Sequence, residues 1–324
     1  MIVDFGVTAA GETVQAVTLQ AGDLSVTVLT LGSILQDVRL QGVDHGLTLG
    51  SDSVADYEGS MRHHGSLVAP VANRICDARA FVAGRTCRFD PNQAGRHTLH
   101  SGSAGAQFKV WQIVAQGADH LTLAVDLPDG EGGFPGNRRV TAVWQVAAPA
   151  TLSLTITTTT DADTLVNCTN HSYWNLDGGA DWAGHRLKIA ADRVTEVDED
   201  LIPTGHLALV RGTPFDLRAG RAIHPGDPAM DTNFCLSDRA QAMRDVLWLT
   251  GRNGLRMTIA TTEPGIQVYD NRKPGRPGKG AYEGLAIEPQ HWPDAPNQPA
   301  FPSVLVPAGG QKVQAMQWRF DREV

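Results

Sequence analysis

Five segments of the chain bring His, Glu, Asp and Asn side chains together with large apolar or aromatic neighbours. They are residues 71–75 (Val-Ala-Asn-Arg-Ile), 98–102 (Thr-Leu-His-Ser-Gly), 167–176 (Asn-Cys-Thr-Asn-His-Ser-Tyr-Trp-Asn-Leu), 231–234 (Asp-Thr-Asn-Phe) and 286–299, which begins Ala-Ile-Glu-Pro-Gln-His-Trp. A hydroxyl-rich ligand requires this combination, because its hydroxyls need paired donors and acceptors while its C–H faces pack on rings. The segments therefore predict a site for a sugar-like molecule.

Two other kinds of site are disfavoured by the spacing. The cysteines, at positions 76, 87, 168 and 235, include no Cys-x-x-Cys pair, which argues against a structural zinc site and a disulfide framework. We expect reduced, mostly buried thiols. Residues 272–280 form a basic, Gly- and Pro-rich segment, but they lack the strand-to-helix context and the trailing Lys-Ser/Thr of a phosphate-binding loop. We expect a solvated hairpin tip there.

The motifs and their order resemble the aldose 1-epimerase family, also called galactose mutarotases. The resemblance rests on Asn-Arg-Ile at 73–75, Leu-His-x-Gly at 99–102, Asn-His-Ser-Tyr-Trp-Asn-Leu at 170–176 and Pro-Asp-Ala-x-Asn-Gln-Pro at 293–299. Similar segments at 128–136, 202–205, 213–216 and 265–269 support it. Several motifs in the family's order are far more specific than any one of them, and together they cover residues 31 to 320.

The resemblance implies a reaction and two catalytic residues. Members of the family interconvert the α and β anomers of a free aldose, of the galactose or glucose type, through an open-chain aldehyde. By similarity, Glu288 is the general base that takes the proton of the C1 hydroxyl. His171 is the general acid that protonates the ring oxygen, and the two exchange roles when the ring closes.

The residue types suit this chemistry. Opening a hemiacetal removes one proton and delivers another across the same carbon, and imidazole can serve as donor or acceptor near neutral pH. A glutamate is a weak base in water, so we expect the surroundings of Glu288, Trp292 among them, to raise its pKa toward neutrality. The reaction needs no metal and no organic cofactor, and none is expected.

The remaining family roles concern sugar binding. By similarity, Asn73, Arg74, His100, Asp231 and Gln267 bind and orient the sugar. Arg74 offers a planar fork of donors to adjacent hydroxyls or to the ring oxygen. His100 provides a second imidazole near the ring oxygen, and Asp231 offers two acceptors for a vicinal diol.

Each assignment has a structural alternative. A histidine in a β-rich protein is usually a surface or core residue, and His63, His64, His97 and His291 are among nine histidines interpreted in that way. His171 and His100 are singled out by motif context alone.

The other candidates have alternatives too. Glu288 could form a salt bridge at a strand end, and Asp231 could be a turn or helix-capping residue. Arg74 could pair with the neighbouring Asp77. The family motif favours the site in each case.

The sequence departs from the family pattern at three places, one of which is the Tyr173-Trp174 pair, a larger ring where many relatives have Phe. Ala69 and Pro70 stand where the family has Gly-Arg before Val-Ala-Asn-Arg, and Thr232 stands where a histidine usually follows the aspartate. We expect the catalytic positions to be unaffected, whereas the sugar-hydroxyl contacts, and with them the substrate preference, are open to change.

Two other functions compete with the epimerase. A non-catalytic sugar-binding or sensor β-sandwich would be expected to lose the acid or the base, yet His171 and Glu288 are both present. A hexose-6-phosphate 1-epimerase would be expected to carry an additional arginine cluster. A glycoside hydrolase would use two carboxylates, in contrast to the His and Glu here.

The elements that must position these residues are predicted to be strands. The 34 glycines and 18 prolines are spread along the chain, which indicates short elements joined by many turns. Apolar and polar residues alternate over 121–127, 151–157 and 316–320, as expected of half-buried antiparallel strands. The best helical pattern covers residues 240–248, where Met243, Val246 and Leu247 form a short apolar stripe.

This periodicity agrees with the fold that the resemblance implies. That fold is all-β, a single large antiparallel β-sandwich with an open sugar cleft on one concave sheet. No composition shift marks a boundary, so residues 1–324 are expected to form one domain.

Length and charge limit the partners. The chain has 324 residues, 42% of them hydrophobic, and a formal net charge of −8, which provides no basic surface for nucleic acid or anionic lipid. The longest uncharged stretch, residues 140–160, is rich in threonine and contains Pro149, so no membrane span is expected. The N-terminus has no signal-peptide pattern. We expect a cytoplasmic protein, a monomer or homodimer, whose partner is a small aldose.

Overall fold

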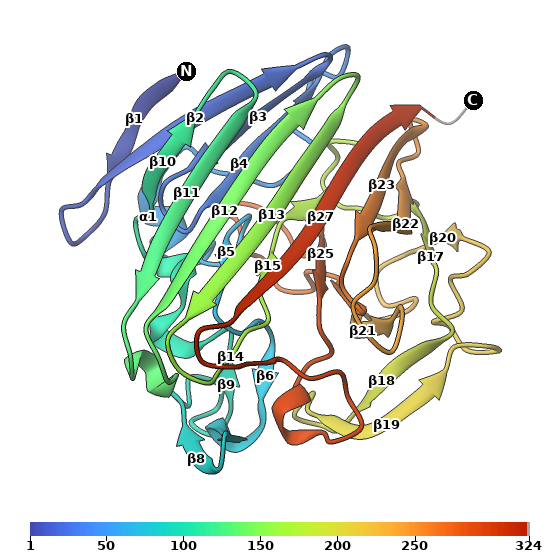
Figure 1. The fold of residues 1–324 in the computed structure, drawn as a ribbon. Helices are drawn as coiled ribbons and strands as arrows, with labels where there is room; N and C mark the ends of the chain where they lie inside the picture. Colours follow the sequence, from blue (N-terminus) through green and yellow to red (C-terminus); the bar gives the residue numbers. More distant parts are fainter. Residues whose placement is uncertain (323–324) are drawn as a thin grey trace.

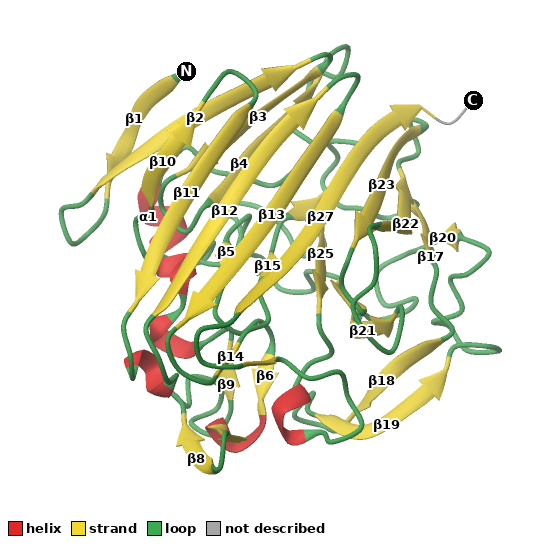
Figure 2. Ribbon diagram, viewed as in Figure 1, coloured by secondary structure: helices red, strands yellow, loops and turns green. Residues whose placement is uncertain are grey.

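The computed structural model describes residues 1–322, and antiparallel strands make up most of it (Figures 1 and 2). The largest sheet has nine strands and forms the broad curved layer in front in Figure 1. In spatial order its strands are β10 (Gln112–Gln116), β11 (His120–Leu127), β12 (Arg138–Ala147), β13 (Thr151–Thr160), β27 (Gln311–Arg322), β23 (Leu255–Thr261), β22 (Arg244–Thr250), β17 (Arg186–Ile189) and β20 (Arg221–Ala222).

Two further sheets share a hydrophobic core with this layer. The four-stranded sheet consists of β1 (Ile2–Val7), β2 (Thr13–Ala21), β3 (Leu24–Leu29) and β4 (Ile34–Leu40). The six-stranded sheet consists of β16 (Tyr173–Trp174), β25 (Leu285–Gln290), β24 (Gly265–Tyr269), β21 (Asp231–Cys235), β18 (Arg193–Val197) and β19 (Pro203–Leu209). The predicted all-β sandwich is confirmed.

The hydrophobic core joins the three sheets. Its main cluster includes Leu123 and Trp318 from the nine-stranded sheet, Val26 from the four-stranded sheet, and Val268 and Ile287 from the six-stranded sheet. The predicted alternation produces it, because every second side chain of a strand points to the same face. Along β13, for example, the apolar residues at 152, 154 and 156 are buried.

Short elements connect the sheets. Four two-stranded pairs are β5 (Leu67–Val68) with β15 (Thr169–Asn170), β6 (Arg74–Ile75) with β9 (Thr98–Leu99), β7 (Arg79–Val82) with β8 (Arg85–Arg88), and β14 (Thr164–Leu165) with β26 (Leu305–Val306). The single α-helix of the described residues is α1 (Val54–Glu58), and 3₁₀ turns occupy Cys76–Ala78, Gly102–Ala104, Ala106–Phe108, Glu131–Gly133 and Ala295–Asn297.

The predicted helix over residues 240–248 is wrong, because most of that segment belongs to strand β22. The register of β22 against β23 shifts between Asp245 and Leu247, so Val246 and Leu247 are both buried. A β-bulge of this kind places two neighbouring apolar residues inward, and that spacing resembles the stripe of an amphipathic helix. Met243, the third member of the stripe, is 42% exposed.

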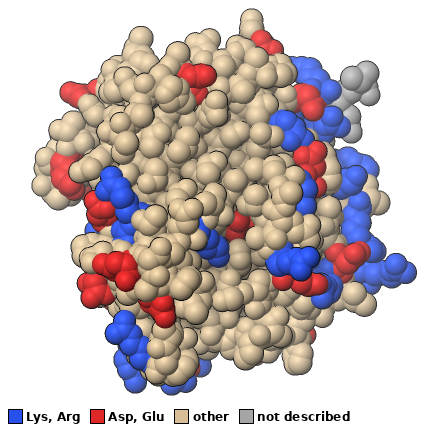
Figure 3. Space-filling view, viewed as in Figure 1, with Lys and Arg blue, Asp and Glu red and all other residues tan. Residues whose placement is uncertain are grey.

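The outer face of the nine-stranded sheet carries few charges. Figure 3 shows this face mostly uncharged, with basic and acidic side chains mixed along its margins. Among residues 1–322 no helix is long and apolar enough to cross a bilayer. All four cysteines are unpaired, and three of them are buried, as predicted.

Candidate active site

A cleft of about 530 Å³ lies against the six-stranded sheet and the loops around it. It is lined by His63, Asn73, Arg74, Gln93, Leu99, His100, His171, Tyr173, Leu201, Asp231, Tyr269, Arg272, Lys273 and Glu288. This lining combines aromatic rings with hydrogen-bonding groups, which is the combination that a sugar requires.

Strand register gathers part of this lining on one face of the sheet. Glu288 on β25 is directly opposite Gln267 on β24, and Tyr269 on β24 is directly opposite Asp231 on β21. Directly opposed residues project from the same face of a sheet. The intervening residues, such as Val268, project into the core. Alternation therefore gives this sheet one apolar face and one polar face.

His171 and Glu288 meet in the cleft. His171 directly follows β15, and its Nε2 lies 3.4 Å from Oε1 of Glu288. Both side chains are almost completely buried. The other heteroatoms, Nδ1 of His171 and Oε2 of Glu288, have no hydrogen-bond partner in the protein. Buried polar atoms are nearly always satisfied, so these two atoms indicate a place for a polar ligand.

Burial shifts both pKa values toward the neutral forms. It raises the pKa of Glu288 well above its usual value, and the negative charge of Asp231 raises it further, against the opposing effect of Arg74. Burial lowers the pKa of His171 to about 4. Both shifts favour the neutral forms, and because the two side chains lie in contact they titrate as a coupled pair.

His100 is fixed by the backbone of Asn73. The ring Nδ1 of His100 accepts a hydrogen bond from the backbone N–H of Asn73 at 3.1 Å, and the backbone N–H of His100 donates to the Asn73 carbonyl at 2.9 Å. Burial and the neighbouring His63 and His171 lower the pKa of His100 well below its usual value, so the ring is neutral. With Nδ1 accepting, the ring hydrogen is on Nε2, and His100 can donate from that atom.

Asp231 is held between two donors. Its Oδ1 accepts from Nε2 of Gln267 at 2.6 Å, and its Oδ2 lies 3.4 Å from Nη2 of Arg74. Arg74 also donates from Nε to Gln93 at 3.1 Å. Arg74 and Asp231 do not form a bidentate ion pair. Only one nitrogen of the guanidinium, Nη2, lies near the carboxylate, at 3.4 Å.

The structure brings together all seven residues predicted from the sequence. Six of them line the cleft, and Gln267 reaches it through its bond to Asp231. Arg74 does not pair with Asp77, whose partners are Arg79 and Arg96. Asp231 begins a strand, and it is not a helix cap.

Two of the three departures from the family pattern lie outside the lining, whereas Tyr173, in the third, lines the cleft. Thr232 is opposite Val268 on β24, so it lies on the apolar side of the sheet, away from Asp231. Ala69 and Pro70 are buried and also do not line the cleft.

Several lining residues were not identified from the sequence. His63 was assigned to the background of structural histidines, yet its ring lies 4.8 Å from that of His100 and 5.7 Å from that of His171. Nothing in its spacing distinguishes it. Tyr269 was identifiable, because it is two residues after Gln267 on one strand and therefore shares its face.

The basic segment at 272–280 is a hairpin connection between β24 and β25, as predicted, but it is more than a solvated tip. Arg272 and Lys273 line the cleft. Arg276 is bound to Glu283 and donates to the carbonyl of Gly50 at 2.8 Å. These contacts hold the segment against the body of the protein.

Among residues 1–322, two groups of side chains have the composition of metal ligands. The ligand atoms of His100, His171 and Glu288 lie within 4.8 Å of one another, and so do those of Cys76, Asp77 and His97. The first group could hold a divalent cation in the cleft. In the second, the guanidinium of Arg96 lies 2.7 Å from Asp77, which disfavours a cation there.

Comparison with known proteins gives consistent similarities. The Aldose 1-epimerase family model matches residues 15–318. Galactose mutarotase of Mus musculus is 31% identical over 96% of this chain and 95% of its own. Aldose 1-epimerase of Escherichia coli K12 is 33% identical over 86% of each chain.

Solved structures show the same fold. A crystal structure of a GalM/aldose epimerase homologue from C. elegans superposes with a TM-score of 0.88 at 28% identity, covering 95% of this chain and 100% of that one. Galactose 1-epimerase from Lactobacillus acidophilus has a TM-score of 0.86 at 22% identity over 100% and 99% of the two chains.

Proposed function

Because the chain belongs to the aldose 1-epimerase family, we propose that it interconverts the α and β anomers of a free aldose, with His171 and Glu288 as the proton-transferring pair. The observation that carries the proposal is their geometry. Two buried groups of opposite acid–base type lie 3.4 Å apart in a polar cleft, each with one unpartnered heteroatom. The name galactose mutarotase, which relatives of this chain carry, supports a galactose-type sugar as the substrate of this protein.

Ring opening requires the ionic form of the pair. The carboxylate of Glu288 removes the proton from the C1 hydroxyl, and the electron pair of that O–H bond forms the C1 carbonyl. The bond between C1 and the ring oxygen breaks, and His171 protonates the departing ring oxygen. The aldehyde is then bound beside a neutral imidazole and a neutral carboxylic acid.

Ring closure uses the neutral form of the same pair. After rotation about the C1–C2 bond, the released hydroxyl attacks the other face of the carbonyl. His171 takes the proton of that hydroxyl, and Glu288 returns its proton to the carbonyl oxygen. One proton shared by two coupled groups thus serves both half-reactions, and no water is consumed.

The binding residues orient the sugar for this exchange. We propose that Asp231 accepts hydrogen bonds from hydroxyls remote from C1, with Gln267 holding its carboxylate in place. Arg74 and the Nε2–H of His100 donate to sugar oxygens, and Asn73 holds His100 through its backbone. His63 and Tyr173 supply the ring surfaces against which C–H groups pack.

The first prediction tests the function. We expect the purified protein to accelerate the optical-rotation change of freshly dissolved α-D-galactose and α-D-glucose, and to do so equally after exhaustive treatment with EDTA. EDTA removes any divalent cation held by His100, His171 and Glu288, so this treatment tests whether the reaction depends on a metal at that group. Boiled protein is the control.

The outcomes separate the alternatives from the sequence analysis. An absence of acceleration with a broad panel of aldoses, despite measurable sugar binding, would favour the non-catalytic sugar-binding protein. Acceleration confined to galactose 6-phosphate or glucose 6-phosphate would favour the hexose-6-phosphate 1-epimerase. Activity that disappears with EDTA would contradict the metal-free route.

The second prediction concerns Asp231. Loss of its charged hydrogen bonds costs about 1.5 to 3 kcal/mol of binding, so Asp231→Asn should raise KM by about ten- to a hundredfold with little change in kcat. Its charge also raises the pKa of Glu288, so its removal should shift the alkaline limb of kcat/KM to lower pH. The alkaline limb is the decrease of kcat/KM at high pH, where the pair of His171 and Glu288 loses its single proton.

Steady-state polarimetry between pH 4 and 10 measures both effects. Asp238→Asn is the matched control, because Asp238 pairs with Arg193 outside the cleft. An unchanged KM together with an unmoved alkaline limb would remove Asp231 from the site.

A further inference from the structure

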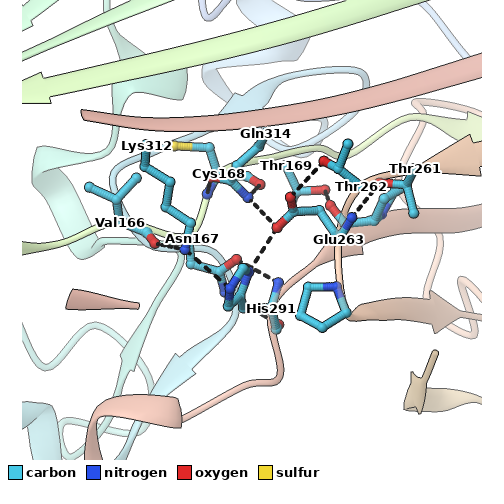
Figure 4. A network of polar contacts seen from close by, with 12 residues as sticks. Val166, Asn167, Cys168, Thr169, Thr261, Thr262, Glu263, His291, Lys312 and Gln314 are labelled. Carbon is cyan, nitrogen blue, oxygen red and sulfur yellow. Dashed lines mark hydrogen bonds and ion pairs between the residues drawn. The ribbon is translucent and has the colours of Figure 1, made fainter. Parts of the chain in front are cut away.

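A buried polar network, shown in Figure 4, lies outside the lining of the cleft. Glu263 comes from the turn between β23 and β24, His291 directly follows β25, and Lys312 and Gln314 belong to β27. All but Lys312 are less than 5% exposed, and Lys312 reaches inward from its strand. None of the proposed catalytic steps uses these groups.

The proton positions in this network follow from its geometry. The ammonium of Lys312, a donor only, lies 3.3 Å from Nε2 of His291, so Nε2 accepts. Nδ1 of His291 therefore carries the ring hydrogen and donates to Oε2 of Glu263 at 2.7 Å. Gln314 donates to the same oxygen at 2.8 Å. One anion and one cation are thus joined through a neutral imidazole.

The network is bonded to the backbone that carries His171. The backbone N–H of His291 donates to Oδ1 of Asn167 at 2.8 Å. The side-chain amide of Gln314 accepts from the Cys168 N–H at 2.7 Å and donates to the Cys168 carbonyl at 3.0 Å. His171 follows only three residues later.

The same network holds the end of the strand that carries Glu288. His291 is three residues beyond Glu288, and the hydroxyl of Thr169 donates to the carbonyl of Pro289 at 2.8 Å. The two catalytic side chains have no protein hydrogen-bond partner for Nδ1 of His171 or Oε2 of Glu288. Apart from the 3.4 Å contact between the two side chains, their relative position is set by the backbone segments that carry them.

We propose that Glu263, His291 and Lys312 act as positioning residues that fix the separation between His171 and Glu288. The inference rests on the proposed function, because it assigns the network a role in that reaction. Buried ion pairs are weak sources of net stability, and their best use is to select one arrangement of the chain. A misplacement of about 1 Å between reacting groups can cost about a hundredfold in rate.

His291→Phe and His291→Gln test this inference. Phenylalanine keeps a ring but removes both nitrogens. Glutamine restores a donor for Glu263 and an acceptor for Lys312 on a single amide. We expect His291→Phe to lower kcat on D-galactose about tenfold or more with KM within about twofold, and His291→Gln to recover most of that loss.

The control is His185→Phe, which removes another buried imidazole, bonded to Leu176 and Trp182 away from the cleft. It should lower the melting temperature without lowering kcat. Lys312→Met provides a second test if His291→Phe does not fold, and it should also lower kcat selectively.

Three results would overturn the inference. The first is wild-type kcat in folded His291→Phe or Lys312→Met, and the second is an equal loss of kcat in His291→Gln and His291→Phe. The third is a loss in His185→Phe that matches theirs. The wild-type protein is measured in the same assay. If it is inactive, the proposed function itself fails, and the inference about positioning fails with it.

Discussion

Glu288→Gln is expected to lower kcat for aldose mutarotation by about 10²-fold or more, with the fold intact. The amide keeps the shape and the burial of the side chain but cannot remove the proton of the C1 hydroxyl. General acid–base catalysis by one positioned group contributes about 10²- to 10⁴-fold, so loss of this group should dominate the rate. KM should change little, because the binding residues remain in place.

The measurement is initial-rate polarimetry on α-D-galactose, with circular dichroism to verify the fold. Glu131→Gln is the matched control, because Glu131 pairs with Lys109 and does not line the cleft. Near-normal kcat in folded Glu288→Gln would remove Glu288 from the role of base.

His171→Asn should produce a loss of similar size for the opposite reason. An asparagine amide can donate a hydrogen bond to the ring oxygen, but it cannot transfer a proton as the ring opens. The expected decrease in kcat is again about 10²-fold or more. The acid limb of kcat/KM should change as well, since burial places the pKa of His171 at about 4 and full protonation of the pair below that pH removes the base.

His185→Asn controls for the loss of a buried imidazole, and the pH profile distinguishes chemistry from folding. Unfolding would lower the amplitude at every pH without removing the limb near pH 4. A variant of His171 that retains both its rate and its acid limb would contradict the assignment.

The strands and the sheet faces could be predicted because the pattern is local. Alternation within one strand identifies which side chains share a face, as for residues 152, 154 and 156 of β13. The same rule applied to β24 places Gln267 and Tyr269 together. It fails where the register shifts, and the bulge in β22 produced the one wrong element.

The composition of the cleft could be predicted only through motifs. The pairing of β25 with β24, and of β24 with β21, brings Glu288 and Asp231 together from distant parts of the chain, and no local pattern encodes that pairing. The seven site residues predicted from motifs therefore lie in the cleft or, for Gln267, beside it. His63 belongs to none, and it was missed although it lies beside His100 and His171.

The buried network of Glu263, His291, Lys312 and Gln314 could not be predicted from the sequence either. His291 was interpreted as an ordinary histidine, and Glu263 and Lys312 lie in unremarkable stretches of the sequence. Their chemistry depends on a neutral ring placed between an anion and a cation from three different elements. Only the packed structure shows that burial lowers the pKa of Lys312 to about 8 and lowers the pKa of His291 as well.

The central claim is that the protein opens and recloses the bond between C1 and the ring oxygen while the C1 oxygen stays attached. It is tested most directly with D-galactose carrying ¹³C at C1 and ¹⁸O on the C1 hydroxyl, observed by ¹³C NMR magnetisation exchange at anomeric equilibrium. The protein should accelerate exchange between the α and β signals, with ¹⁸O retained in both anomers. Exchange no faster than in buffer, or loss of ¹⁸O in step with exchange, would contradict it.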